Sequence, residues 1–160
     1  MLRISRRPAM SITLATPADL GALLPLFCGY LEFYQRPHEE AEVRAFLVQR
    51  LERGDSVLFL ARNGQGEAQG FVQLYPLQAS LQLAPAWLLS DLFVSPAARR
   101  QGLAEALMQA ARDHALATGA CGLQLETAKD NLAGQALYEK LGYVRDEVFY
   151  TYWLDLSDSV

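Results

Sequence analysis

The sequence contains few residues of the kinds that bind metal ions. Only two of its 160 residues are cysteines and only two are histidines. Cys28 and Cys121 are far apart in the chain and lack the spacing of metal ligands, so we interpret them as free, buried thiols in a reducing cytoplasm. A disulfide or a nucleophilic cysteine is the alternative. Because His38 and His114 are the only histidines, we expect no zinc site.

The sequence also lacks a long hydrophobic run. No apolar segment approaches the roughly 18 residues that a membrane span needs, although 51% of the residues are hydrophobic. Residues 1–10 include Arg3, Arg6 and Arg7, but no apolar core of roughly 7–15 residues follows them, which is not typical of a secretion signal. We therefore expect a soluble, cytoplasmic chain with no membrane partner, in which residues 1–10 form a basic tail.

Basic residues are scarce outside this tail. The whole chain has 14 lysines and arginines against 18 acidic residues, a net charge of −4. Three of the arginines and none of the acidic residues lie in the tail, so the remaining chain has 11 basic and 18 acidic residues and a net charge of −7. Such a surface repels nucleic acid and tolerates a cationic partner. We therefore expect no nucleic-acid partner.

The hydrophobic pattern predicts one domain over residues 11–157. Its elements follow the order β-α-α-β-β-β-α-β-α-β-β, which indicates an α/β (mixed α+β) fold with a mixed sheet of about seven strands and helices on both faces. The strand–helix–strand unit over residues 87–127 is expected to be a right-handed parallel crossover. Residues 143–156 are predicted to form a pair of strands around Arg145-Asp146.

Local signals set the expected ends of the first two helices. Thr16 is a suitable N-cap, and Pro17 suits the first helical position. Pro25 and Gly29 lie inside the first helix, where they predict a kink or a break. Gly54 is a typical C-terminal stop for the second helix.

The segment VSPAARRQGLAEAL, residues 94–107, joins a strand to a helix. A helix that begins at about residue 101 leaves its first N–H groups without internal partners, and its dipole adds about half a positive charge there. Arg99 and Arg100 add whole charges, and Gly102 lets a ligand approach the backbone. The segment therefore predicts a phosphate site. The alternative is a solvated arginine pair in an ordinary loop. The GxxxxGK(S/T) and GxGxxG motifs of other phosphate loops are absent.

Two motifs in the second half of the chain resemble those of the GNAT superfamily of N-acetyltransferases. The first is RRQGLA, residues 99–104, which fits Arg/Gln-x-x-Gly-x-Gly/Ala after a strand that ends in Leu-Phe-Val. The second is Asn131 at the start of a helix, followed by ALYEKLGY at residues 136–143. The resemblance is specific over residues 87–143 and rests on the order of elements over residues 12–80. With VFYTYW near the end, it looks most like the branch of histone and polyamine-type acetyltransferases.

The resemblance implies a GNAT-like, strongly twisted sheet that binds acetyl-CoA, without a metal. In this superfamily the strands corresponding to residues 87–94 and 122–127 splay apart, and the thioester lies in the gap. The pyrophosphate would bind the side chains of Arg99 and Arg100 and the N–H groups of Gln101, Gly102, Leu103 and Ala104. The pantetheine arm would pair, like an added strand, with Asn131 and with the backbone of Leu92, Phe93 and Val94. Position 104 is alanine where many members have glycine, which the motif permits.

Acetyl transfer needs a neutral amine, a stabilised oxyanion and a proton for the leaving thiolate. The resemblance implies a backbone N–H near Val94 as the oxyanion donor and Tyr138 as the acid that donates to the coenzyme sulfur. Tyr138 lies seven residues, about two helical turns, beyond Asn131 and hence on the same face. A phenol with the model-peptide pKa of about 10 is protonated at neutral pH. The alternative is that Tyr138 is a core side chain.

Asp91 and Glu126 are the candidates for binding the acceptor amine or relaying its proton. Both are acids in strands expected to be central, where a charge is costly without a purpose. Alternation places Asp91 on the face of Leu89 and Phe93, and Glu126 on the face of Gln124. The alternative for each acid is a hydrogen-bonded polar group at a strand end.

Other candidates are less specific. Residues 148–153, VFYTYW, place aromatic side chains on both faces of the predicted last strand. Most are expected in the core, while some wall the acceptor pocket or form the interface of a homodimer. His38 either lines the acceptor cleft or lies on the surface, and we expect His114 to be structural.

These inferences predict an enzyme that moves an acetyl group from acetyl-CoA to a primary amine of a small molecule, polyamine-like or amino-acid-like, by direct attack in a ternary complex. The acidic chain fits a cationic acceptor. Two alternatives stay open. One is a peptide or protein as the acceptor, and the other is an acyl-CoA-binding regulatory module without turnover.

Overall fold

The computed structural model describes residues 9–157, so the arginines of the predicted basic tail lie outside the described residues. The chain divides into two compact units, Met1–Glu126 and Thr127–Val160. The described part of the first unit contains β1 (Ser11–Leu14), α1 (Leu20–Phe33), α2 (Glu40–Arg53), β2 (Val57–Arg62), β3 (Ala68–Ala79), β4 (Ala84–Val94), α3 (Leu103–Ala117) and β5 (Leu123–Leu125). The second unit contains α4 (Leu132–Lys140).

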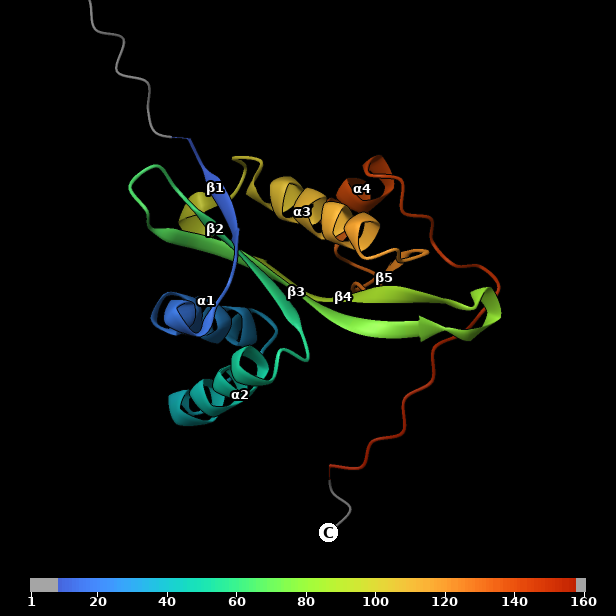
Figure 1. Cartoon of the computed structure of the whole chain (residues 1–160), viewed down its shortest axis with the longest axis horizontal. Coiled ribbons are helices and arrows are strands. Elements are labelled where there is room, and N and C mark those ends of the chain that lie inside the picture. The colour runs from blue at the N-terminus through green and yellow to red at the C-terminus, as the bar shows by residue number, and fades with distance from the viewer. Residues whose placement is uncertain (1–8, 158–160) are drawn as a thin grey trace, which may run out of the picture. The chain divides into compact units, whose positions relative to one another are not determined.

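The strands of the first unit form one sheet in the order β1-β2-β3-β4-β5 (Figure 1). The first four strands are antiparallel to their neighbours, whereas β4 and β5, which α3 connects, are parallel. α1 and α2 cover one face of this sheet and α3 covers the other. The predicted mixed sheet, the helices on both faces and the parallel pairing across the crossover are therefore confirmed.

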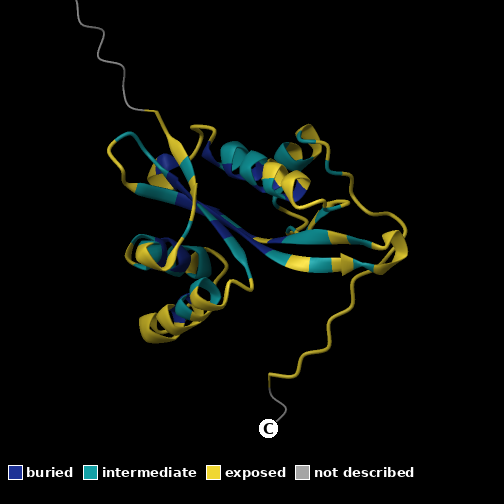
Figure 2. Cartoon of the chain, in the orientation of Figure 1, coloured by how far each residue is buried: buried dark blue, intermediate teal, exposed yellow. Residues whose placement is uncertain are grey.

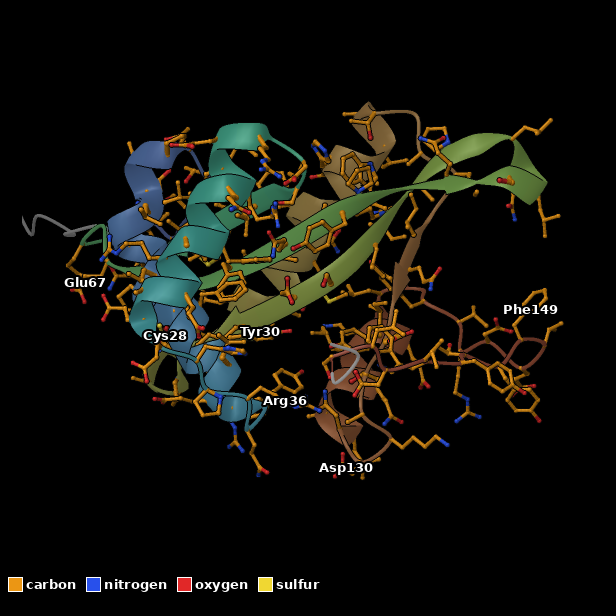
Figure 3. All side chains as sticks on the ribbon, turned by 90° about the horizontal axis from the view of Figure 1, so that it is seen from below. Cys28, Tyr30, Arg36, Glu67, Asp130 and Phe149 are labelled. Atoms are coloured by element: carbon orange, nitrogen blue, oxygen red, sulfur yellow. The ribbon has the colours of Figure 1, made fainter. Side chains whose placement is uncertain are left out.

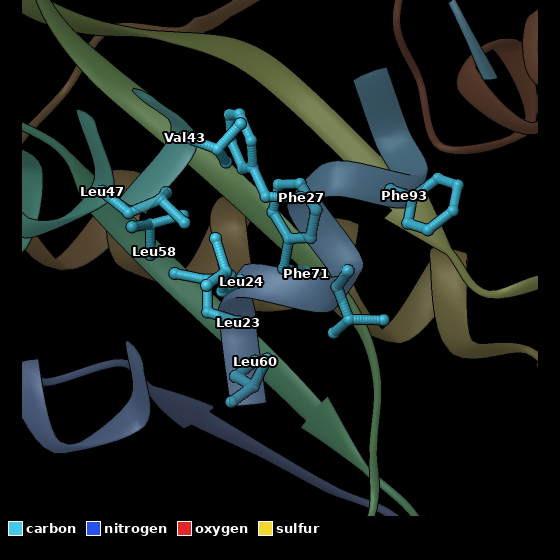
Figure 4. Close-up of a cluster of buried hydrophobic side chains, with 10 residues drawn as sticks. Leu23, Leu24, Phe27, Val43, Leu47, Leu58, Leu60, Phe71 and Phe93 are labelled. Carbon is cyan, nitrogen blue, oxygen red and sulfur yellow. The ribbon is translucent and has the colours of Figure 1, made fainter. Parts of the chain in front are cut away.

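Alternation along the strands gives each face of the sheet its own apolar core. On the side of α1 and α2 the buried cluster shown in Figure 4 consists of Leu23, Leu24, Leu26, Phe27, Val43, Leu47, Leu58, Leu60, Phe71 and Phe93. On the other side Val72, Leu74 and Leu89 are buried, as are Leu107 and Met108 of α3. The buried residues gather where the strands pass between the helices (Figure 2). Each such side chain contributes about 1.5–3 kcal/mol of burial free energy.

A β-bulge at Ser90 changes which face of the sheet the residues of β4 occupy. Leu89 lies opposite Leu74 of β3, but Asp91 lies opposite Gln73, so Ser90 is the extra residue. Adjacent residues of β3 point to opposite faces, and Leu89 and Asp91 therefore do so as well. The prediction that Asp91 shares a face with Phe93 is confirmed, and the prediction that it shares one with Leu89 is wrong.

The helix signals in the sequence are mostly confirmed. Thr16 and Asp19 form a capping box around a short 3-10 helix, Pro17–Asp19, that leads into α1. Gly54 ends α2 in a left-handed conformation with φ of 60°. Pro25 does not break α1, which runs unbroken from Leu20 to Phe33. Among the described residues, no helix has the length and apolar character needed to cross a bilayer.

The end of the chain does not form the predicted strand pair. Residues 143–157 contain no strand, so the described residues have five strands instead of about seven. A strand needs a neighbour for its backbone hydrogen bonds. The backbone of this segment instead makes local hydrogen bonds, in which Asp146 Oδ1 accepts from the N–H groups of Val148 and Phe149. The aromatic residues Phe149, Tyr150, Tyr152 and Trp153 are consequently exposed, not in a core (Figure 2).

Candidate functional site

Two residues adopt a left-handed backbone in the loop between β4 and α3. Arg100 has φ of 63° and Gly102 has φ of 78°. Glycine takes this conformation without steric cost, whereas for arginine it costs roughly 1–3 kcal/mol. The strained loop leads directly into α3, which begins at Leu103, about two residues later than predicted.

The start of α3 can bind an anion. Within the described residues the N–H groups of Gln101, Gly102, Leu103 and Ala104 have no backbone acceptor. The aligned peptides of this 15-residue helix add a partial positive charge at the same end. Open space surrounds the position where a side chain on Gly102 would begin. A hollow of about 470 Å³ lies beside Gln101 and is otherwise lined by Met10, Asn63, Gly64, Gln65, Gln69 and Leu103. These features fit a phosphate group.

The edge of β4 that faces β5 is open over its last residues. β5 pairs only with residues 87–89 of β4, although β4 continues to Val94. Residues 90–94 therefore have no strand partner on this side within the described part of the chain. An unpaired edge of this kind offers backbone N–H and C=O groups to an extended, amide-rich ligand.

Arg99, the first of the two neighbouring arginines of the loop, contacts both β4 and α1. The Arg99 Nε donates a hydrogen bond of 3.0 Å to the carbonyl oxygen of Val94. Its guanidinium lies 5.3 Å from the ring centre of Phe33 and 5.8 Å from that of Phe93, which are cation–π distances. The structure thus places Arg99 at the end of β4 and beside α1. The sequence predicted only two equivalent phosphate ligands.

Asp91 belongs to a chain of hydrogen bonds on the face that α1 and α2 cover. Its Oδ1 accepts from the hydroxyl of Tyr30 at 2.7 Å, and its Oδ2 accepts from Nε2 of Gln73 at 2.7 Å. The hydroxyl of Ser56 donates to Oε1 of Gln73 at 2.8 Å. Tyr30 projects from α1 toward the sheet (Figure 3). Gln73 is fully buried and Asp91 is 9% exposed. The prediction of Asp91 as a buried acid on β4 is confirmed.

Two tyrosines face this carboxylate. Burial, and then the negative charge of Asp91, raise the pKa of Tyr30 far above its ordinary value. The same two causes raise the pKa of Tyr75 to about 12, although Arg50 lowers it somewhat. Both phenols therefore stay protonated throughout the physiological range, and Tyr30 acts as a neutral hydrogen-bond donor to Asp91. Sequence reasoning missed Tyr30, but the lone glutamine in the apolar strand FVQLY was a signal for Gln73.

The other predicted acid is not brought to Asp91. Glu126 lies after the end of β5 and is exposed, so the prediction that it stands in a central strand is wrong. Glu126 makes no hydrogen bond or ion pair within the described residues. His38 lies on the surface, with its Nδ1 3.5 Å from a carboxylate oxygen of Glu42. Of the two free cysteines, Cys28 is half-buried and Cys121 is exposed, not buried as predicted.

The second unit carries the other two predicted residues. Asn131 caps α4: its Oδ1 accepts from the N–H of Gly134 at 3.1 Å, and its Nδ2 donates to the Thr127 hydroxyl at 3.0 Å. A Cβ at position 134 would collide with the side-chain amide of Asn131, so a larger residue there would displace this cap. Tyr138 lies on the same helix, with its ring centre 6.3 Å from that of Tyr143. The structure therefore gives Asn131 a structural role and places Tyr138 on α4 as the sequence predicted.

Comparisons with known proteins identify the family. The family model described as "Acetyltransferase (GNAT) family" matches residues 23–143. The uncharacterized N-acetyltransferase YhfO of Bacillus subtilis (strain 168) is 40% identical over 147 residues, which cover 92% of this chain and 98% of that protein. A probable acetyltransferase of Haemophilus influenzae (strain ATCC 51907 / DSM 11121 / KW20 / Rd) is 33% identical over 121 residues, or 76% of this chain and 83% of that protein.

Solved structures agree with this result. The crystal structure of a probable acetyltransferase matches with a TM-score of 0.88 and 40% identity, covering 92% of this chain and 99% of that one. An aminoglycoside N-acetyltransferase in complex with CoA matches with a TM-score of 0.81 over 94% of this chain and 98% of that one, and its 21% identity shows the fold alone. The predicted fold class and family resemblance are confirmed. The chain belongs to the GNAT family of acetyltransferases, and it is an N-acetyltransferase that uses acetyl-CoA.

Proposed function

We propose that the chain acetylates the primary amine of a small cationic molecule, polyamine-like or amino-acid-like, by direct attack of the amine on acetyl-CoA in a ternary complex. The proposal rests on Asp91. Its carboxylate is nearly buried, and no ion pair within the described residues neutralises it. A buried charge is costly unless it finds a partner of opposite charge. The ammonium group of an amine acceptor is such a partner.

The same proposal assigns the donor to the loop and to the open edge of β4. Acetyl-CoA supplies the acetyl group as a thioester. Arg100 and the free N–H groups of residues 101–104 would hold its pyrophosphate, and the backbone of residues 92–94 would pair with its pantetheine arm. The Nε of Arg99 donates to the carbonyl of Val94, so the terminal nitrogens of its guanidinium would hold the pyrophosphate.

Asn131 can contribute to this binding without leaving its cap. An amide oxygen has two lone pairs, and Gly134 uses one of those on Asn131 Oδ1. The second lone pair can accept from an amide N–H of the pantetheine arm. A backbone N–H on the open edge of β4 would donate to the oxyanion, but that of Ser95 would not, because it already donates to Gln69.

Tyr138 is the proposed acid of the reaction. When the amine nitrogen bonds to the acetyl carbon and the carbon–sulfur bond breaks, the thiolate takes the phenolic proton of Tyr138. Before the attack the bound ammonium group loses one proton to Asp91 or to water, and the second proton, which the nitrogen loses after the attack, returns through water to the Tyr138 phenolate. Replacing Tyr138 by phenylalanine should lower kcat by about 10²–10⁴-fold, the usual contribution of a positioned acid. Tyr143→Phe, on the same unit, is the matched control. Turnover unchanged by Tyr138→Phe over the whole pH range would exclude this role.

A peptide acceptor is the second candidate function. Over 61 residues, 38% of this chain, the sequence is 41% identical to N-alpha-acetyltransferase 30 of Schizosaccharomyces pombe (strain 972 / ATCC 24843). This match spans only 41% of that protein. The position of Asp91 favours a slender amine over a folded protein surface, because Asp91 is only 9% exposed and its partner Tyr30 packs against other aromatic rings.

An acceptor screen tests the proposal. The purified chain is mixed with acetyl-CoA and one acceptor at a time, and the release of free CoA is followed for polyamines, amino acids and short peptides. We expect release with small primary amines and little with peptides. Release with peptides alone would favour the second candidate. Binding of acetyl-CoA without release for any amine would support a regulatory module instead of an enzyme acting on amines.

A further inference from the structure

We infer that Gln73, oriented by Ser56, is a positioning residue that holds the carboxylate of Asp91 for the ammonium group of the acceptor. This inference deepens the proposed function and rests on it. Gln73 is fully buried, so it cannot be explained as a solvated polar side chain, and Ser56 is half-buried. Both belong to one directed chain of hydrogen bonds.

The direction of this chain follows from the charge of Asp91. An ionised carboxylate only accepts hydrogen bonds, so the amide NH₂ of Gln73 must face Asp91, as the 2.7 Å contact requires. The amide oxygen then points the other way, and the hydroxyl of Ser56 must donate to it. Ser56 thus gives the amide oxygen a donor in this orientation, whereas the opposite orientation would set the amide oxygen against the carboxylate, two acceptors facing each other.

The carboxylate keeps acceptor sites that its two hydrogen-bond donors do not use. Of its roughly four lone-pair sites, Tyr30 and Gln73 occupy two. Both donors are neutral, so they orient and stabilise the negative charge but do not cancel it. Tyr30 itself lies 6.3 Å from Phe93, ring centre to ring centre, in an edge-on contact beside Asp91. Aromatic faces also attract cations.

This arrangement defines the class of acceptor. An ammonium group on an apolar stem would place its charge at Asp91 and its stem among the aromatic rings. A neutral molecule of the same shape gains nothing from the carboxylate. A sugar-like polycation would have to bury hydroxyl groups against the same rings, which provide few partners for them. We therefore assign the site to a primary ammonium group on an aliphatic or aromatic stem.

Butylammonium and its uncharged counterpart butanol test this assignment without any turnover. Binding of each probe to the full chain is followed by NMR chemical shifts of the protein. We expect butylammonium to bind and butanol not to bind, and Asp91→Asn to abolish the difference. Equal binding of the two probes, or butylammonium binding unaffected by Asp91→Asn, would overturn the ammonium site.

Variants of Gln73 and Ser56 test the positioning role. Gln73→Leu should weaken butylammonium binding by about tenfold, the effect of losing one hydrogen bond to a charged group. Ser56→Ala should weaken it by less, because Ser56 contacts only the neutral amide of Gln73. Ser56→Thr keeps the hydroxyl and should restore binding. Val72→Ala, a neighbour on the opposite face of β3, is the control for general loosening and should leave binding unchanged. Wild-type binding by both Gln73→Leu and Ser56→Ala would refute the role of Gln73.

The two proposals fail in different ways. If butylammonium binds as expected but no amine releases CoA from acetyl-CoA, the proposed function falls and the ammonium site stands. Suppose instead that amines are acetylated and that Asp91→Asn raises the KM for the amine, while Gln73→Leu and Ser56→Ala leave it unchanged. In that case the proposed function stands and the positioning role of Gln73 is refuted. In the positive case the variants raise the KM for the amine while the KM for acetyl-CoA stays constant.

Discussion

The two faces of the sheet in the first unit are built from different kinds of residue, although the same strands supply both. Toward α3, the positions of β3 and β4 are apolar and buried, as at Val72, Leu74 and Leu89. Toward α1 and α2, the phenylalanines of the same strands are followed by Gln73 and Asp91, which lie side by side. The first face serves stability alone, whereas the second gives up apolar burial at two adjacent positions.

The bulge at Ser90 creates this difference within one strand. Without it, alternation would place Leu89 and Asp91 on the same face. With it, the charge of Asp91 joins the polar chain through Gln73 and Tyr30, and Leu89 joins the apolar core. A single inserted residue therefore separates the part of β4 that belongs to the apolar core from the part that carries the charge of Asp91.

Placing a charged residue on the apolar face should have the largest effect on stability. Leu89→Asp buries a carboxylate among leucine and valine side chains that cannot pair with it, at a cost of several kcal/mol. Because a domain of this size is stable by only about 5–15 kcal/mol, we expect the cooperative thermal transition to disappear or to fall far below that of the wild type. Circular dichroism measures it, and Leu89→Met is the control. A transition near that of the wild type would show that the two faces do not differ.

On the other face a comparable change should affect activity and spare the fold. Asp91→Asn keeps the shape of the side chain but removes the charge; its amide oxygen can still accept from Gln73, and its NH₂ group can donate to the Tyr30 hydroxyl in place of the present bond. We expect kcat/KM for a cationic amine to fall by about 10²-fold, with a melting temperature close to that of the wild type. Steady-state kinetics and a thermal melt on the same preparation measure both. A large loss of stability with unchanged kcat/KM would reverse the comparison.

A methyl group at Gly70 tests whether a change in the packing of the sheet alters the position of the β4 backbone. The Cβ of Gly70→Ala would stand 2.8 Å from the carbonyl oxygen of Phe93 and 3.3 Å from side-chain atoms of Leu107 and Val94. The end of β4 must therefore shift, at a cost of roughly 1–3 kcal/mol. We expect lower stability and a KM for acetyl-CoA raised several-fold. An increase confined to the KM for the amine would place the donor elsewhere than along β4.

Much of this arrangement could be predicted because it depends on local signals. The cap at Thr16, the stop at Gly54 and the turn into α3 each follow from a few neighbouring residues. The bulge at Ser90 could not be predicted, because an extra residue in a strand leaves no mark on the apolar pattern. The end of the chain has the composition of a strand, yet composition cannot supply the neighbour that a strand needs.

The sequence indicated which residues belong to the candidate site better than it indicated which of them contact one another. Asp91 is conspicuous as an acid in an apolar strand, but its partner Tyr30 lies 61 residues away in the chain. Arg99 was identified as a cation of the loop, yet its contact with Phe33 joins segments that no sequence motif connects. Residue types indicate the chemistry at a site, and the packing of distant elements decides which of them meet.

The smallest predicted effect concerns a titratable group on the apolar side. His114 of α3 contacts the rings of Phe59 and Trp87, and its Nε2 is buried with no hydrogen-bond partner among the described residues. Burial lowers the pKa of His114 below its ordinary value of about 6.5. The folded state therefore binds this proton less readily than the unfolded state does. Stability should be complete above about pH 6.5 and should decline as the pH falls below it.

Replacing this histidine isolates the effect. His114→Phe keeps an aromatic ring against Phe59 and Trp87 but cannot be protonated, so the decline of the melting temperature between about pH 6.5 and 5 should become shallower. His38→Phe is the control, because His38 is exposed on the surface beside Glu42 and has no such burial. An unchanged pH dependence in His114→Phe would show that His114 does not set the acid sensitivity of the fold.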